Sequence, residues 1–222
     1  MNETLVLIHT MPFLVDVFDG LCREKLPGVK IYHVLNEPLL EHVRQSGDIQ
    51  PEDLEQLQTH VSTAETIGAS AVLVTCSTLS PAVDYIHAHI PVLKIDEAMI
   101  AQAVKSGTRI GVIATSRTTM LPTQGLLQNE AEHTGREIDV CMVYVENALQ
   151  ALVNGDGATH DSLVREAVLE LAEKVDVIIL AQASIARVAK RLAEDQIKTP
   201  VLSSPITALG RIGDVLMRGA KP

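Results

Sequence analysis

The sequence predicts an α/β protein built from two similar lobes, each a mostly parallel sheet flanked by helices. Short apolar runs alternate with longer amphipathic segments along the chain, which is typical of βαβ units. The apolar runs are rich in Val, Ile and Leu, as in parallel strands that are buried on both faces. Of the 222 residues, 46% are hydrophobic but only 2% are aromatic, so we expect an aliphatic core.

The apolar runs are the predicted strands, and the segments between them are the predicted helices. The helix that begins at Pro51 carries acidic residues in its first turn and is followed by Gly68, which are usual signals for helix ends. The expected strands are residues 5–8, 29–34, 71–74, 92–95, 109–114, 138–143, 177–180 and 200–202, and the expected helices are a segment after Pro12 up to Leu26, then 51–67, a helix from Pro81, 122–134, 147–153, 161–174, 185–194 and a helix from Pro205.

Residues 70–78 and 176–184 form an internal repeat. Each segment is an apolar strand that ends in small polar residues, and each is followed by a helix and a Pro-Val-Leu strand. The repeat predicts two lobes related by a pseudo-two-fold axis. Because ligands bind at the carboxyl ends of parallel strands, we expect the active site in the cleft between the lobes. The predicted lobes are residues 1–95 with 205–222, and residues 96–204.

Charge and composition exclude several classes of protein. The formal net charge is −10, which argues against nucleic acid or an anionic membrane as partner but allows a small anionic substrate. No apolar run approaches the roughly 20 residues that span a bilayer, and the first residues lack the features of a signal peptide. The odd set of Cys22, Cys76 and Cys141 has no C-x-x-C spacing, so we expect neither a disulfide framework nor a zinc site. These features predict a cytoplasmic protein.

Cys76 is the candidate for chemistry. It follows a predicted buried strand and precedes a predicted helix, with Thr75, Ser77 and Thr78 around it. Backbone N–H groups and a helix dipole at this position would lower the thiol pKa from about 8.5, and the hydroxyl groups would hold an oxyanion. The alternative is a small buried apolar residue, which is the commonest role of a free cysteine.

Two segments resemble motifs of the aspartate/glutamate/hydantoin racemase superfamily. Residues 74–78 resemble its first catalytic-cysteine motif, and residues 110–119 resemble its second-lobe strand, which ends in Thr-x-x-Thr. The resemblance spans nearly the whole chain and implies a homodimer that acts on a small anionic substrate, an amino acid or a dicarboxylate, with no cofactor. It also implies that Cys76 exchanges the α-proton. The substrate-binding residues that we expect are Thr10, Ser77, Thr78, Thr115, Thr118, Thr119, Gln182 and Ser184.

The chain departs from this family at the second cysteine. The family uses two cysteines on opposite faces of the substrate α-carbon, but the repeat places Gln182 at the second position. Glutamine does not exchange a proton near neutral pH. Cys141 lies in a predicted strand and is expected in the core. Three interpretations stay open: a true racemase with another group on the second face, a one-thiol decarboxylase or isomerase of a malonate-like diacid, or a small-acid-binding protein without catalysis.

His9 is the second candidate catalytic residue. It follows the first predicted strand, where it would face the cleft as a second base or a substrate-binding donor. A polar loop residue that caps the backbone is an equal alternative. The other seven histidines show no metal-ligand spacing, so no metal is expected. Arg117, in the Thr-rich segment, would pair with a second substrate carboxylate or remain a solvated loop charge.

Overall fold

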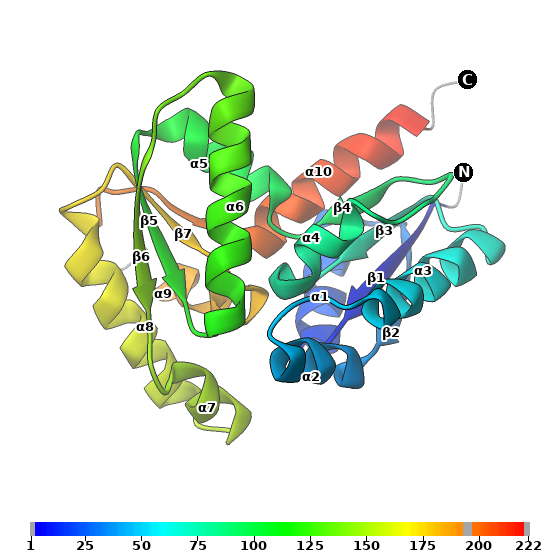
Figure 1. Cartoon of the computed structure of the whole chain (residues 1–222), viewed down its shortest axis with the longest axis horizontal. Coiled ribbons are helices and arrows are strands. Elements are labelled where there is room, and N and C mark those ends of the chain that lie inside the picture. The colour runs from blue at the N-terminus through cyan, green and yellow to red at the C-terminus, as the bar shows by residue number, and fades with distance from the viewer. Residues whose placement is uncertain (1–2, 193–196, 220–222) are drawn as a thin grey trace. The chain divides into compact units, whose positions relative to one another are not determined.

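The computed structural model describes residues 3–192 and 197–219, and the chain divides into two compact units (Figure 1). Unit 1 comprises Met1–Ile95 with Pro205–Pro222, and unit 2 comprises Asp96–Ser204. The elements of unit 1 are β1 (Thr4–His9), α1 (Phe13–Lys25), β2 (Lys30–Leu35), α2 (Glu37–Ser46), α3 (Pro51–Thr66), β3 (Ala71–Val74), the 3₁₀ helix η1 (Ser77–Leu79), α4 (Ser80–Val83), β4 (Val92–Lys94) and α10, which begins at the junction (Ser204–Gly219).

Unit 2 repeats this arrangement, beginning with a helix. Its elements are α5 (Glu97–Ser106), β5 (Arg109–Ala114), α6 (Arg117–Thr134), β6 (Asp139–Tyr144), α7 (Ala148–Val153), α8 (Gly157–Ala172), β7 (Val177–Leu180), the 3₁₀ helix η2 (Ala183–Val188), α9 (Ala189–Leu192) and β8 (Val201–Ser203).

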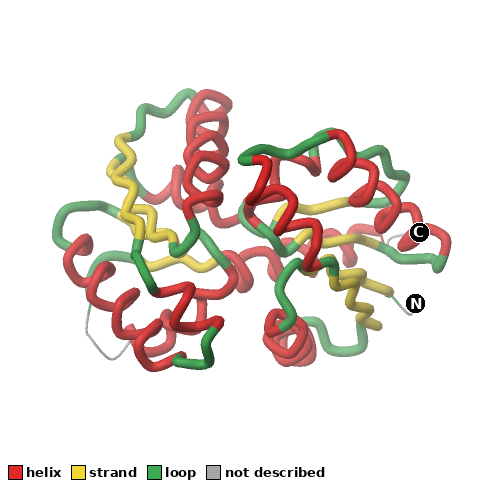
Figure 2. Tube along the Cα trace, turned by 60° about the horizontal axis from the view of Figure 1, so that its bottom comes forward, coloured by secondary structure: helices red, strands yellow, loops and turns green. Residues whose placement is uncertain are grey.

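The two sheets have the same topology. Each has four parallel strands, in the order β2-β1-β3-β4 in unit 1 and β6-β5-β7-β8 in unit 2. Helices flank both sheets, as Figure 2 shows for each unit. The predicted α/β class is therefore confirmed, and the predicted sequence repeat falls on β3 and β7, which occupy the same place in their sheets.

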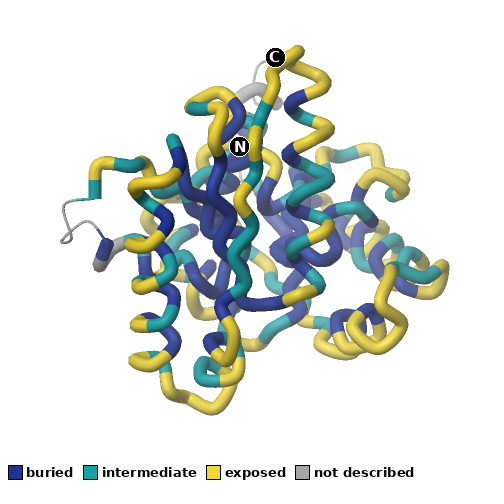
Figure 3. Tube along the Cα trace, turned by 60° about the vertical axis from the view of Figure 1, so that its left-hand side comes forward, coloured by how far each residue is buried: buried dark blue, intermediate teal, exposed yellow. Residues whose placement is uncertain are grey.

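Successive side chains of the central strands point to opposite faces of the sheet, so a hydrophobic core forms on each face. In unit 2, Ile110 and Val112 of β5 pack in one cluster with α5 and α6, whereas Ile113 packs in another with α8. In unit 1, Val6 and Ile8 of β1 pack in a cluster with α2 and α3. In Figure 3 the buried segments lie along the central strands, and several helices are buried along only one side. The apolar runs in the sequence correspond to these strands because both of their faces are covered.

Helix α6 differs from its prediction. It begins at Arg117, five residues before the predicted start at Pro122, and Pro122 lies inside it. A proline here removes one backbone donor from the helix without ending it. Thr118 and Thr119, which precede the predicted start of this helix, therefore belong to its first turn.

Other helices were missed or are shorter than predicted. Helix α2 was not predicted. The helix predicted from Pro81 is a 3₁₀ turn followed by the four-residue α4. The helix predicted at residues 185–194 is η2 followed by α9, and Glu194 lies outside the described residues. Within the described part of the chain, no helix combines the length and apolar character needed to cross a bilayer.

Gly111 is the position in β5 where an added side chain would force neighbouring core side chains to shift. A Cβ added there would lie 2.5 Å from Leu171 Cδ2. We expect Gly111→Ala to lower the free energy of unfolding by about 1–3 kcal/mol, because the core must shift. Urea unfolding measures this. Gly125→Ala in α6 is the matched control, since an added Cβ meets nothing within 4 Å there; alanine should raise stability by about 0.5–1 kcal/mol. Equal effects of the two substitutions would contradict the close packing of β5.

Candidate active site

The pairing of β1 with β3 continues one residue past the end of β3. The register joins Ile8 to Val74, and the Thr75 N–H donates to the Ile8 carbonyl at 3.0 Å. The residues that follow the two strands, Thr10 after β1 and Cys76 after β3, are thereby brought together at the carboxyl edge of the sheet. Cys76 then begins η1 as its N-cap residue, with extended backbone.

The Cys76 sulfur is buried and surrounded by hydrogen-bond donors. The residue is 8% exposed. Its thiol interacts with the Thr10 hydroxyl, with the Thr78 hydroxyl and amide, and with the Leu79 amide. Donors of this kind stabilise a thiolate more than a thiol. Two predicted site residues, Thr10 and Thr78, therefore lie at the sulfur. The Leu79 amide, which donates to the Cys76 carbonyl at 2.9 Å, also lies near the sulfur and was not identified from the sequence.

The pKa of Cys76 is shifted in the direction opposite to the one predicted. Loss of hydration on burial raises the pKa of the thiol, and the Thr10, Thr78 and Leu79 donors offset this rise only in part. The prediction of a lowered pKa was wrong because desolvation disfavours the charged form of any buried acid. The helix that follows is also too short to supply a strong dipole, since η1 and α4 have three and four residues. Cys76 therefore rests as a neutral thiol.

Ser77 is the next residue of η1. It is 5% exposed, and its hydroxyl has no hydrogen-bond partner among the described residues. Buried polar groups almost always have a hydrogen-bond partner in native proteins, so an unpaired hydroxyl next to the thiol calls for an explanation. It is available to donate a hydrogen bond to a bound group.

His9 belongs to a directed chain of hydrogen bonds. The Thr75 hydroxyl donates to the Ile8 carbonyl at 2.9 Å, and it lies 2.8 Å from His9 Nδ1. Because that hydroxyl hydrogen is already used, His9 Nδ1–H must be the donor to Thr75. His9 Nε2 is then the acceptor for His33 Nδ1–H, at 2.9 Å. The chain runs from His33 through His9 and Thr75 to the backbone of β1.

This chain argues against the catalytic role that we expected for His9. The residue is 0% exposed, and both ring nitrogens are bonded within unit 1. Burial, together with a smaller effect of the neighbouring His33, lowers the pKa of His9 from the ordinary 6.5 to about 3. His9 is therefore a neutral residue that positions Thr75, directly before Cys76. Sequence analysis assigned no role to His33, and it placed the Thr75 hydroxyl among the groups expected to hold an oxyanion, whereas this hydroxyl is bonded to Ile8 and His9. The pairing of adjacent strand ends was the signal that could have related Thr75 to His9.

In unit 2, Gln182 occupies the position that Cys76 has in unit 1. The register joins Ile113 of β5 to Leu180 of β7, and the Ala181 N–H donates to the Ile113 carbonyl at 3.0 Å. Gln182 follows as the N-cap residue of η2, again with extended backbone. The sequence repeat, which aligns Gln182 with Cys76, therefore agrees with the backbone structure at these two residues.

The Gln182 side chain is bound at the start of α6. Its Oε1 accepts hydrogen bonds from the Thr115 amide at 2.6 Å, the Ser116 amide at 3.1 Å and the Thr115 hydroxyl at 3.1 Å. Sequence analysis predicted Thr115 as a holder of the substrate carboxylate. In the structure its donors are directed at Gln182 instead, and the Ser116 amide is a donor that the sequence analysis did not single out.

The remaining predicted residues of unit 2 lie near this contact in sequence. The Thr118 hydroxyl is 2.9 Å from the Ser116 hydroxyl, and Thr119 is buried in the first turn of α6. Ser184, in η2, is 6% exposed, and its hydroxyl has no partner in the described part of the chain. The exposed Arg117 guanidinium lies 4.2 Å above the centre of the Tyr144 ring, which is the geometry of a cation–π contact.

The other two cysteines differ from each other in exposure. Cys22 is buried, and burial raises its pKa to about 11, with a smaller contribution from Asp19. Cys141 is exposed on β6, which is an edge strand. The prediction that Cys141 lies in the core was wrong, because β6 is an edge strand and Cys141 is exposed there.

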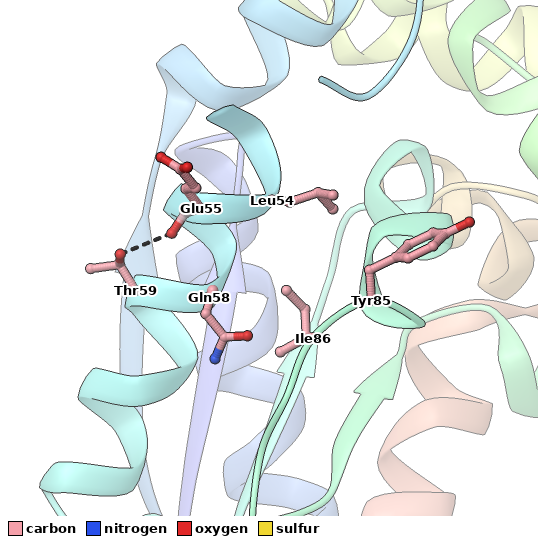
Figure 4. Close-up of a pocket in the computed structure, with 6 residues that line it drawn as sticks. All are labelled: Leu54, Glu55, Gln58, Thr59, Tyr85 and Ile86. Atoms are coloured by element: carbon pink, nitrogen blue, oxygen red, sulfur yellow. Dashed lines mark hydrogen bonds between the residues drawn. The ribbon is translucent and has the colours of Figure 1, made fainter. Parts of the chain in front are cut away.

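A surface groove of about 490 Å³ lies between α3 and the segment after α4. Figure 4 shows Leu54 and Gln58 of α3 on one side and Tyr85 and Ile86 on the other. None of the predicted site residues lines it, so we do not assign the chemistry to this groove. No three His, Cys, Asp or Glu side chains among the described residues are placed to hold a metal ion.

The family model for Asp/Glu/Hydantoin racemase matches residues 14–210. This chain belongs to the Asp/Glu/hydantoin racemase family. The resemblance predicted from the sequence is thereby confirmed, and membership supports a racemase-type enzyme of the isomerase class. No curated protein sequence gives a significant match to this chain.

Solved structures of racemases share the fold of this family member. The Picrophilus torridus aspartate racemase superposes with a TM-score of 0.75 at 12% identity, covering 94% of this chain and 95% of that one. An allantoin racemase from Klebsiella pneumoniae gives a TM-score of 0.75 at 18% identity, covering 98% and 89%. A putative Asp/Glu racemase from Yersinia pestis gives 0.70 at 21% identity, covering 96% and 99%. At these identities the likeness concerns the fold.

The burial of His9 predicts a dependence of stability on pH. Above pH 6.5 neither state binds a proton at this residue. Between pH 6.5 and about 3 the unfolded chain binds a proton that the native state refuses, so the free energy of unfolding should fall as the pH falls. Urea unfolding from pH 7.5 to 4.5 measures this slope. His9→Gln should reduce the slope, and it should do so more than the control His133→Gln, which replaces a histidine at an exposed helix position. An unchanged slope in His9→Gln would show that His9 titrates normally.

Proposed function

We propose that this protein moves the α-proton of a small carboxylate, an amino acid or a dicarboxylate, through the single thiol of Cys76. The observation that carries the proposal is the set of donors at this sulfur, which comes from Thr10, Thr78 and Leu79. A buried sulfur with no charge to stabilise needs no such donors. Their convergence suits a sulfur that alternates between thiol and thiolate during a reaction.

The proposed step is a proton transfer that passes through an enediolate. The resting thiol first loses its proton to water. As a thiolate, Cys76 then takes the α-proton, and the electron pair of the broken C–H bond moves into the carboxylate to give the enediolate. The new thiol exchanges its proton with water, delivers a proton to carbon and becomes a thiolate again. The Ser77 hydroxyl, buried and unpaired, is a donor that could stabilise the developing oxyanion. The proposal requires no cofactor.

A second candidate function is favoured by Gln182 and by the raised pKa of Cys76. Loss of carbon dioxide from a malonate-like diacid leaves the electron pair of the broken C–C bond in an enediolate. A resting thiol can then donate its proton to that carbon, and the thiolate recovers a proton from water. This reaction needs an acid on one face only, which agrees with a thiol in unit 1 and an amide at the equivalent position of unit 2.

The first test compares two cysteine substitutions. Wild-type protein incubated with L-aspartate, L-glutamate, malonate or a 5-substituted hydantoin in deuterated water should incorporate deuterium at the α-carbon of at least one of them. Cys76→Ser should lower this rate by about 10²–10⁴-fold, because an alcohol is a much weaker acid than a thiol. Mass spectrometry of the recovered compounds measures the exchange.

Cys141→Ser is the matched control, because it removes an exposed thiol from β6 and leaves the Cys76 site intact. It should exchange at the wild-type rate. Retained exchange in Cys76→Ser would refute the proposal. Binding of these acids with no exchange in the wild type would indicate the small-acid-binding alternative.

The second candidate predicts one product enantiomer. A prochiral 2,2-disubstituted malonate should release carbon dioxide, and chiral chromatography of the monoacid should show a single enantiomer, because protonation comes from the Cys76 side alone. Cys76→Ser should slow the release by a similar factor. A racemic product would mean that a second group also delivers protons, which would rule out one-face chemistry.

A further inference from the structure

The amide of Gln182 has a fixed orientation. Two of the three groups that meet its Oε1 are backbone N–H groups, which can only donate, so the atom facing them must be the carbonyl oxygen. The Nε2 group is thereby turned away from these donors. It has no hydrogen-bond partner among residues 3–192 and 197–219.

The donors that hold Gln182 are of the kind that bind carboxylates. Two consecutive amides, those of Thr115 and Ser116, precede the 18-residue helix α6, whose dipole favours an oxygen that carries negative charge. The Thr115 hydroxyl completes the set. Gln182 therefore acts as an internal ligand that already occupies these donors.

The two unpaired groups of this segment are both able to donate. One is Gln182 Nε2 at the N-cap of η2. The other is the hydroxyl of Ser184, two residues later, which is more than nine-tenths buried and unpaired in the described structure. At the position equivalent to the reactive thiol of unit 1, unit 2 thus presents hydrogen-bond donors that do not exchange protons with carbon.

We propose that Gln182 is a specificity-determining residue: with its oxygen anchored by Thr115 and Ser116, it offers its Nε2 group to a carboxylate oxygen of the substrate. This inference rests on the proposed function for the identity of the ligand as a small carboxylate. It adds that Gln182 binds a carboxylate through a neutral donor and takes no part in proton transfer.

Gln182→Glu tests the donor directly. A glutamate has the same size and its oxygen accepts the same three hydrogen bonds, so the segment keeps its anchor but loses both N–H donors and gains a negative charge. With malonate as the probe, isothermal titration calorimetry should show at least a tenfold weaker affinity than the wild type. Gln150→Glu is the control, since it adds the same charge at an exposed position of α7, and its affinity should match the wild type.

Amide hydrogen exchange by NMR tests the anchor without a ligand. In Gln182→Met, which has a similar length but no acceptor oxygen, the Thr115 and Ser116 amides should exchange at least tenfold faster than in the wild type, while the amides in β5 stay protected. In Gln182→Glu these two amides should remain protected, which also shows that this variant is folded.

Wild-type affinity for malonate in Gln182→Glu would overturn the inference, as would unchanged exchange of both amides in Gln182→Met. Malonate binding that depends on Gln182, without turnover of any carboxylate, would refute only the chemistry assigned to Cys76. Absence of malonate binding to the wild type would contradict the ligand class and with it the role of Gln182, whereas deuterium exchange on another acid would still support Cys76.

Discussion

The pairing of parallel strands continues past the ends of the two central strands in each sheet, and every proposed role depends on this constraint. In unit 1 the bond from Thr75 to Ile8 brings the residues after β1 beside those after β3. In unit 2 the bond from Ala181 to Ile113 does the same for β5 and β7. The same backbone thus produces two different environments: a thiol that receives hydrogen bonds, and an amide whose oxygen is held while its nitrogen is free of partners in the described structure.

Two opposing effects set the state of Cys76. Burial removes water from the sulfur and favours the neutral thiol, whereas the donors from Thr10, Thr78 and Leu79 favour the thiolate. Because burial prevails, the resting group is an acid, and the donors reduce the cost of charging it when a proton leaves. The neutral His9 beneath this site adds no positive charge that would shift the balance, and it keeps Thr75 in place through a hydrogen bond.

Much of the architecture could be predicted from the sequence, because apolar strands and the repeat depend on local order along the chain. Gln182 could be identified as the residue that replaces the family's second cysteine, because the repeat aligns it with Cys76. The contact of Gln182 with Thr115 was not predicted, since it joins residues that are 67 positions apart. The burial of His9 and the exposure of Cys141 also depend on which helices cover each strand. The shift of the Cys76 pKa was predicted in the wrong direction. The position of Cys76 between a strand and a helix can be read from the sequence, but the loss of water around its sulfur cannot.

The most direct test of this account is the rate of alkylation of Cys76 by iodoacetamide as a function of pH, followed by mass spectrometry of the peptides. We expect the folded protein to react first at the exposed Cys141. Cys76 should react more slowly, with an apparent pKa above that of a free thiol, and a bound dicarboxylate should slow its reaction further. Rapid alkylation of Cys76 at neutral pH, with an apparent pKa below that of a free thiol and no protection by any carboxylate, would contradict the buried acid at the centre of this account.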